Sequence, residues 1–214
     1  MFFPNWICTH HRNGTAVAED SLQQECSFVV LVGNSSPLPL FNYAVQGALR
    51  NIRTVWLMSN PRYNSLFQIR PSLDHQTLKK ISFKFVSSYS DVILYFANIH
   101  LLEDHELPSL LFLDEFQLSC TGTEYSPQMF ARTLAFALDA ANHVTDRKKK
   151  LDEADEGCLI VVSVDVLDSI PGNILKKFGS YFLFVNEISS GFKVDLQYSD
   201  SIHKQFLFEG TMDS

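Results

Sequence analysis

The sequence predicts an α/β fold in which helices flank a mostly parallel sheet that ends in an antiparallel hairpin. Two observations predict the parallel sheet: short, wholly apolar runs recur from residue 26 onward, and longer amphipathic segments separate them. Strands without a polar face are buried on both sides, as in a parallel sheet covered by helices. The hairpin is predicted by a third observation, the turn Ser189-Ser190-Gly191 between two strand-like segments near the C-terminus.

The apolar runs set the order of the predicted strands. A short helix and another strand are expected between the second and third runs, and the helices between the remaining strands have recognisable starts. One helix is predicted from Pro39 to Arg50 and another from Ser90 to Leu102. The buried runs are residues 28–32, 54–58, 110–113 and 159–162.

The clearest helix begins at Ser126, which is a good N-cap followed by Pro127 at the first helical position. Its apolar residues recur on one face as far as Val144. The basic run 147–150 at its end is interpreted as a solvated helix terminus, where cations favour the helix dipole. That terminus leads into a strand, so it should lie at the edge of the sheet opposite any nucleotide.

The length and composition indicate one folded domain, with apolar area available for a core, for a partner surface, or for both. The chain has 214 residues, of which 46% are hydrophobic and 19% charged, and 18 are Phe, so it is neither disordered nor collagen-like. A net charge of −7 repels phosphate backbones, so a nucleic-acid role would need a local patch or a partner. An obligate subunit is therefore plausible.

The chain is divided into a flexible N-terminal arm, residues 1–25, and a core domain, residues 26–210. The arm is polar and shows no sustained period. The start resembles no secretory signal, the four cysteines form no CxxC motif, and no stretch is long enough for a membrane helix, which favours an intracellular protein with reduced thiols. We expect no metal site, because the only Cys/His group matches no structural zinc spacing. That group is Cys8, His10, His11 and Cys26.

The loop after the first predicted strand occupies the position of a phosphate-binding loop. In parallel α/β sheets ligands bind at the carboxyl ends of the strands. The motif GxxxxGK[ST] requires a second glycine, a lysine and a hydroxyl, and here Leu38, Pro39 and Leu40 replace them. Pro39 also lacks the N–H that would cradle a phosphate. The degenerate loop comprises Gly33, Asn34, Ser35, Ser36, Pro37, Leu38, Pro39 and Leu40.

The strand predicted at 110–113 ends in Asp114 and Glu115, which gives it the shape of a Walker B strand. An acid in this position is either a loop anchor or a magnesium-side acid, and the sequence supports both readings. Because side chains alternate along a strand, Asp114 and Glu115 should point to opposite faces. We therefore expect no paired-carboxylate site and no catalytic residue here.

The order and spacing of these segments over residues 26–188 resemble the RecA-type recombinase paralogues of homologous recombination. More narrowly, they are similar to the ATPase-like subunits of animal Shu complexes, which associate with SWIM-domain proteins, and to nematode members that pair with a recombinase paralogue. The resemblance depends on the loop at Gly33, the segment 78–85, the strand 110–115, and the helix 134–143 followed by the strand 159–162.

This resemblance implies a RecA-like core in the nucleus that stabilises or remodels the strand-exchange recombinase filament on single-stranded DNA. The partners implied are a recombinase paralogue in a heterodimer, the filament, and a SWIM-domain zinc protein. Asp114 and Glu115 would lie at the Walker B-like partner interface. ATP and magnesium would bind, if at all, at a site shared with a partner. The DNA-facing loops, 120–125 and 165–173, contain no Lys or Arg, so single-stranded DNA should be reached mainly through partners.

Two other functions fit the same pattern. One is a weak P-loop ATPase whose phosphate-binding loop has diverged, and the other is an unrelated α/β scaffold protein. Phe41 and Ala44 are the residue types with which an extended recombinase linker docks onto the neighbouring core. Their place in a predicted helix, however, predicts that they belong to the core of this chain.

Overall fold

The structure is a computed structural model, and nine stretches of it are described here. The predicted N-terminal arm lies outside them, so the boundary between arm and core is not tested. The described residues are 28–33, 38–58, 74–114, 126–151, 157–164, 172–178, 181–188, 191–198 and 202–209.

Five parallel strands form the centre of the fold, and this confirms the predicted α/β class. Their order in the sheet is β3-β2-β4-β5-β1, and every neighbouring pair is parallel. β1, β2 and β4 are buried at every residue, as the wholly apolar runs predict. The strands are β1 (Phe28–Val32), β2 (Thr54–Met58), β3 (Ile81–Phe85), β4 (Leu110–Asp114) and β5 (Leu159–Val164).

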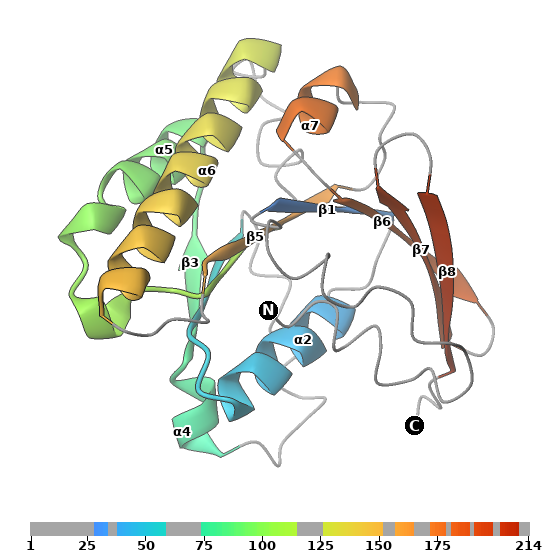
Figure 1. The fold of residues 1–214 in the computed structure, drawn as a ribbon, viewed down its shortest axis with the longest axis horizontal. Coiled ribbons are helices and arrows are strands. Elements are labelled where there is room, and N and C mark those ends of the chain that lie inside the picture. Colours follow the sequence, from blue (N-terminus) through green and yellow to red (C-terminus); the bar gives the residue numbers. More distant parts are fainter. Residues whose placement is uncertain are drawn as a thin grey trace.

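Helices cover both faces of this sheet (Figure 1). The connection from β1 to β2 runs one way across the sheet and the connections from β3 to β5 run the other way. Because crossovers are right-handed, opposite directions place the helices on opposite faces. One face carries α2 (Leu38–Leu49) and α4 (His75–Leu78), and the other carries α5 (Tyr89–Ala97), α6 (Pro127–Lys150) and α7 (Gly172–Phe178).

Three C-terminal strands extend the sheet beyond β1 in the order β6-β7-β8. They are β6 (Tyr181–Ile188), β7 (Gly191–Tyr198) and β8 (Ile202–Glu209). Most of their side chains lie outside the described residues. The predicted antiparallel hairpin therefore stays a prediction.

Each face of the sheet has its own apolar core, because neighbouring residues of a strand point to opposite faces. Leu111 and Leu113 belong to the core under α5, α6 and α7, whereas Leu110 and Phe112 belong to the core under α2. Phe41 and Ala44 are also buried in the α2 core, as predicted, so neither is available as a docking tether.

Two helix starts show how local sequence sets these elements. The Oγ atom of Ser126 accepts a hydrogen bond from Met129 N at 3.1 Å, which confirms the predicted N-cap of α6. The prediction for α5 was wrong by one or two residues at its start, because Ser88 is the N-cap and its Oγ accepts from Asp91 N at 3.2 Å. α5 also ends early, at Ala97, and the chain continues as the 3₁₀ turns η2 (Ile99–Leu101) and η3 (Asp104–Glu106).

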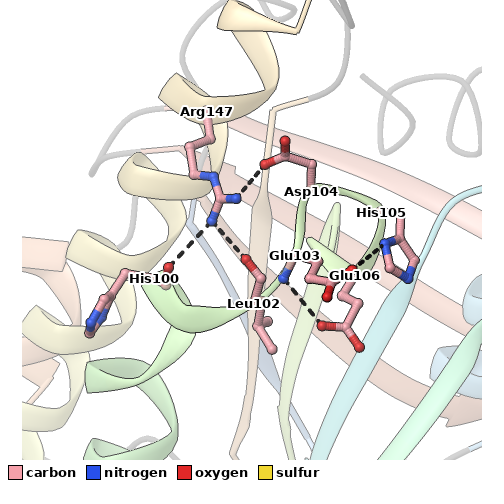
Figure 2. A network of polar contacts seen from close by, with 7 residues as sticks. All are labelled: His100, Leu102, Glu103, Asp104, His105, Glu106 and Arg147. Atoms are coloured by element: carbon pink, nitrogen blue, oxygen red, sulfur yellow. Dashed lines mark hydrogen bonds and ion pairs between the residues drawn. The ribbon is translucent and has the colours of Figure 1, made fainter.

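The basic run at the end of α6 is not a fully solvated terminus, and this corrects the sequence interpretation for two of its four residues. The Arg147 guanidinium donates to the carbonyl oxygen of Leu102 at 2.9 Å and to that of His100 at 3.4 Å. It also forms an ion pair with Asp104 (Figure 2). Arg147 therefore ties α6 to the turns η2 and η3.

Lys148 departs further from the interpretation, since only 4% of it is exposed. Its ammonium donates a hydrogen bond to Ser109 Oγ, just before β4 begins. The periodicity of α6 explains this position, because residue 148 is four residues after the buried Val144 and thus on the same face. Lys149 and Lys150 are exposed, as predicted.

Burial also governs the chemistry of Cys158, the residue just before β5. Burial raises the pKa of the Cys158 thiol to about 12, and the charge of Lys148 opposes this rise in part. The thiol is therefore neutral near pH 7 and has the character of a core residue.

We predict that Arg147→Ala lowers the free energy of unfolding by about 1–3 kcal/mol, because it leaves two carbonyl acceptors and Asp104 without this donor. Chemical denaturation monitored by circular dichroism measures the change. Lys149→Ala is the matched control, since it removes the same charge from an exposed position of the same helix and should change stability by less than about 0.5 kcal/mol. Equal effects of the two substitutions would contradict the role of Arg147 as a tie.

Candidate functional site

The first residue of the degenerate loop is fixed by the sheet. Gly33 N donates to Val164 O at 3.0 Å, which extends the pairing of β1 and β5 by one residue. Gly33 has φ 138°, a backbone angle that residues with a Cβ rarely adopt. The chain therefore leaves β1 in a direction that depends on glycine. Asn34, Ser35, Ser36 and Pro37 lie outside the described residues.

The loop ends at α2, and the first turn of this helix contains Leu38, Pro39 and Leu40. The N–H groups of a first helical turn are those that bind an anion, since no residue within the helix accepts from them. Pro39 is the second residue of α2 and supplies no N–H. At the backbone level, therefore, this turn is poorer in donors than a phosphate-binding helix start.

Asp114 is the last residue of β4, and only 6% of it is exposed. One carboxylate oxygen, Oδ2, accepts a hydrogen bond from Trp56 Nε1 at 3.1 Å. The other, Oδ1, accepts from the hydroxyl of Ser163. The carboxylate thus joins β4 to both of its neighbours, since Trp56 is in β2 and Ser163 is in β5.

The three side chains meet because they share the α2 face of the sheet. Ser163 follows Val161 by two residues and Asp114 follows Phe112 by two, and both earlier residues belong to the α2 core. Ser163 is also the partner of Leu31 in the pairing of β5 with β1. One strand, β5, separates Asp114 from β1, which puts them about 10 Å apart across the sheet at the usual strand spacing.

Aromatic packing fixes the direction of the Trp56 indole. Its ring lies 4.9 Å from the ring of Phe112 and 5.6 Å from that of Phe83, measured between centroids. Trp56 is completely buried. Such contacts hold the N–H toward the end of β4, so this donor does not have to be ordered when it bonds Asp114.

The described residues include one of the two acids predicted at the Walker B-like position. Asp114 is the one predicted site carboxylate that is described, and each of its oxygens accepts a hydrogen bond from its own chain. Glu115 and the loops 120–125 and 165–171 lie outside the described residues. Among the residues that are described, no group of three or more His, Cys, Asp and Glu side chains could hold a metal ion. The Cys/His group of the arm lies in the part not described.

Sequence reasoning did not identify Trp56 and Ser163 as partners of Asp114. One signal was present: Ser163 interrupts the otherwise apolar strand Leu159–Val164, and a buried hydroxyl requires a hydrogen-bond partner. Trp56 gave a weaker signal, since an indole N–H in a buried strand also needs an acceptor. Neither signal indicates which residue is the partner, because that depends on the strand order.

Comparison with known proteins assigns no family to the chain. No protein-family model matches it, and no curated protein is significantly similar to it in sequence. Within the described residues, no helix is both long enough and apolar enough to cross a membrane.

We predict that Ser163→Ala lowers the free energy of unfolding by about 1.5–3 kcal/mol, because it removes a donor to a buried carboxylate. Thermal or denaturant unfolding of the purified chain measures the loss. Ser90→Ala, an exposed position of α5, removes the same hydroxyl as a control and should change stability by less than about 0.5 kcal/mol. A Ser163→Ala protein as stable as the wild type would show that the Asp114 carboxylate does not depend on this hydroxyl.

Proposed function

We propose that the chain is a non-catalytic subunit of a recombination-mediator complex, with a RecA-like core and an antiparallel C-terminal hairpin. In this function it binds a recombinase paralogue in the nucleus. The pair then stabilises or remodels the strand-exchange recombinase filament on single-stranded DNA. The proposal originates in the sequence resemblance over residues 26–188, and features of the described residues support it.

The strand order supports the RecA-like part of the proposal. β1 and β5 are neighbours, yet the chain leaves β1 for α2 on one face and leaves β5 for α7 on the other. Adjacent strands that diverge in this way create the crevice in which α/β proteins bind ligands. In this chain the two strands diverge beside Gly33, where the degenerate loop begins.

The observation that most favours a binding subunit over an enzyme is that the Asp114 carboxylate is hydrogen-bonded within its own chain. Its carboxylate, at the end of β4, accepts hydrogen bonds from Trp56 in the middle of β2 and from Ser163 near the end of β5, so it links three neighbouring strands. A carboxylate with this role supports the shape of the carboxyl edge of the sheet without any nucleotide. In recombinase-type assemblies the same edge faces the neighbouring subunit, so an anchored edge suits protein association.

We predict that the purified chain neither hydrolyses ATP nor binds Mg-ATP with micromolar affinity. The loop lacks the lysine, the second glycine and the hydroxyl that bind phosphate and metal, and α2 begins with Leu38-Pro39-Leu40 in their place. Isothermal titration calorimetry and a phosphate-release assay check this. Micromolar Mg-ATP binding that disappears in Asp114→Asn would instead support the rival function, a weak ATPase with a divergent loop.

We predict that the chain co-purifies with a recombinase paralogue after co-expression, and that Asp114→Ala weakens the complex about tenfold or more, equivalent to roughly 1.4 kcal/mol. The physical reason is that three neighbouring strands lose the carboxylate that links them near the edge that meets the partner. Size-exclusion chromatography and a pull-down measure association, and thermal unfolding of the separate chain tests whether it remains folded.

Asp139→Ala is the matched control for this experiment, because Asp139 is an exposed acid of α6. It should leave association unchanged. If no recombinase paralogue co-purifies, the mediator function is wrong and an unrelated α/β scaffold becomes the better explanation. If association by Asp114→Ala falls only in proportion to its unfolding, Asp114 is an ordinary structural acid.

A further inference from the structure

Two turns at the amino edge of the sheet bring together four cations that are far apart in the sequence. Arg50 and Arg53 lie between α2 and β2, and Lys79 and Lys80 lie between α4 and β3. We call these four residues the basic turns. Figure 1 shows α4 beside the C-terminal end of α2, which is where the two turns meet.

Hydrogen bonds fix the two turns against each other. The Lys80 ammonium donates to the carbonyl oxygen of Ala48 at 3.2 Å, so this charge lies at the end of α2, beside Arg50. Thr54 N, the residue after Arg53, donates to Lys80 O at 2.9 Å. The two turns that carry the four cations are therefore adjacent, although the cations differ in sequence position by up to thirty residues.

The backbone of the first turn is preorganised by a Schellman motif. Ile52 N donates to Gly47 O at 2.9 Å and Asn51 N donates to Ala48 O at 3.1 Å. Asn51 adopts φ 69°, the left-handed conformation that this motif requires. Arg50 is exposed at the end of the helix, so its direction from the backbone is fixed before any partner binds.

Within the two turns themselves, the charge balance is opposite to that of the whole chain. Residues 47–54 and 76–81 contain these four cations and no carboxylate, whereas the whole chain has a net charge of −7. The acid that precedes them, Asp74, caps α4 and accepts hydrogen bonds from Thr77 N and Thr77 Oγ1. Hydrogen bonds from Thr77 lower the pKa of Asp74, and the charge of Lys80 contributes in the same direction. A positive area on an acidic protein selects an anionic partner.

The composition of the turns favours a protein over a nucleic acid. Leu49, beside Arg50, is a large apolar side chain of which 56% is exposed. Residues 47–54 and 76–81 contain no Phe, Tyr or Trp, the side chains on which the bases of single-stranded DNA stack. An apolar contact with charged residues around it is the usual arrangement of a protein interface.

We propose that the basic turns bind an acidic, leucine-containing segment of a partner protein, with Leu49 as the apolar contact. This edge of the sheet is opposite the one that carries Gly33 and Asp114, since α2 runs from the carboxyl edge at Leu38 to the amino edge at Arg50. The inference rests on the proposed function only for the identity of the partner. It adds a second binding surface, with its chemistry, to that function.

The test uses the full chain and a fluorescein-labelled peptide of five Asp-Glu-Leu triplets, with binding followed by fluorescence anisotropy. We expect saturable binding that weakens as NaCl is added. The double substitution Arg50→Glu, Lys79→Glu should reduce affinity about tenfold or more, because it replaces attraction with repulsion. The control Lys149→Glu, Lys150→Glu makes the same change in net charge at exposed positions of α6 and should alter affinity less than about twofold.

Two further probes examine the apolar contact and the class of partner. Leu49→Ser should weaken binding of the Asp-Glu-Leu peptide several-fold, without effect on a peptide of five Asp-Glu-Ser triplets. A labelled oligonucleotide of fifteen deoxythymidines should bind more weakly than the Asp-Glu-Leu peptide at the same salt concentration. Thermal unfolding of each variant confirms that it is folded.

Several outcomes would overturn the inference. The first is that the peptide shows no saturable binding, and the second is that the two double variants lose peptide affinity equally. The third is that the leucine and serine peptides bind equally well. The fourth is that the oligonucleotide binds more tightly than the peptide and loses this affinity in Arg50→Glu, Lys79→Glu. None of these results affects co-purification with a recombinase paralogue. The two proposals can therefore fail separately.

Discussion

Apolar side chains cover both faces of β1, β2 and β4, and this double burial is the constraint on which the rest of the structure depends. A sheet buried on both sides needs a helix layer on each face, and right-handed crossovers supply both layers only if the chain reverses direction across the sheet. The reversal occurs after β3, and it divides the helices between the two faces. It also makes β1 and β5 diverge at the carboxyl edge, where the candidate site lies.

Double burial also determines where polar groups can enter the sheet. Asp114 and Ser163 lie at the ends of their strands and bond each other, and Ser109 lies just before β4 and accepts from Lys148. The interior remains apolar between these two polar edges, since buried polar groups are tolerated only with partners. A carboxylate thus links neighbouring strands near the carboxyl edge, and an ammonium links α6 to the start of β4 at the amino edge.

The sequence allowed the elements and their faces to be predicted, but not the contacts between distant segments. The apolar residues that recur along α6 as far as Val144 were assigned to one face from periodicity alone, and that face is buried at Phe130, Leu134 and Val144. Lys148 has the same helical phase as Val144, yet its charge suggested solvent. Its hydrogen bond to Ser109 depends on the start of β4 lying under the end of α6, which is a tertiary fact. The pairing of Trp56 with Asp114 and the meeting of the basic turns depend on strand order in the same way.

The two edges of the sheet differ in the groups that they present. At the carboxyl edge, Asp114 accepts hydrogen bonds from its own chain, and the first turn of α2 lacks a backbone donor at Pro39. At the amino edge, Arg50 and Lys79 are exposed in turns fixed by backbone hydrogen bonds. Because α2 spans the distance between the edges, a partner at one edge leaves the other accessible. The two edges could therefore each bind a different protein, which is the arrangement that the proposed mediator function requires.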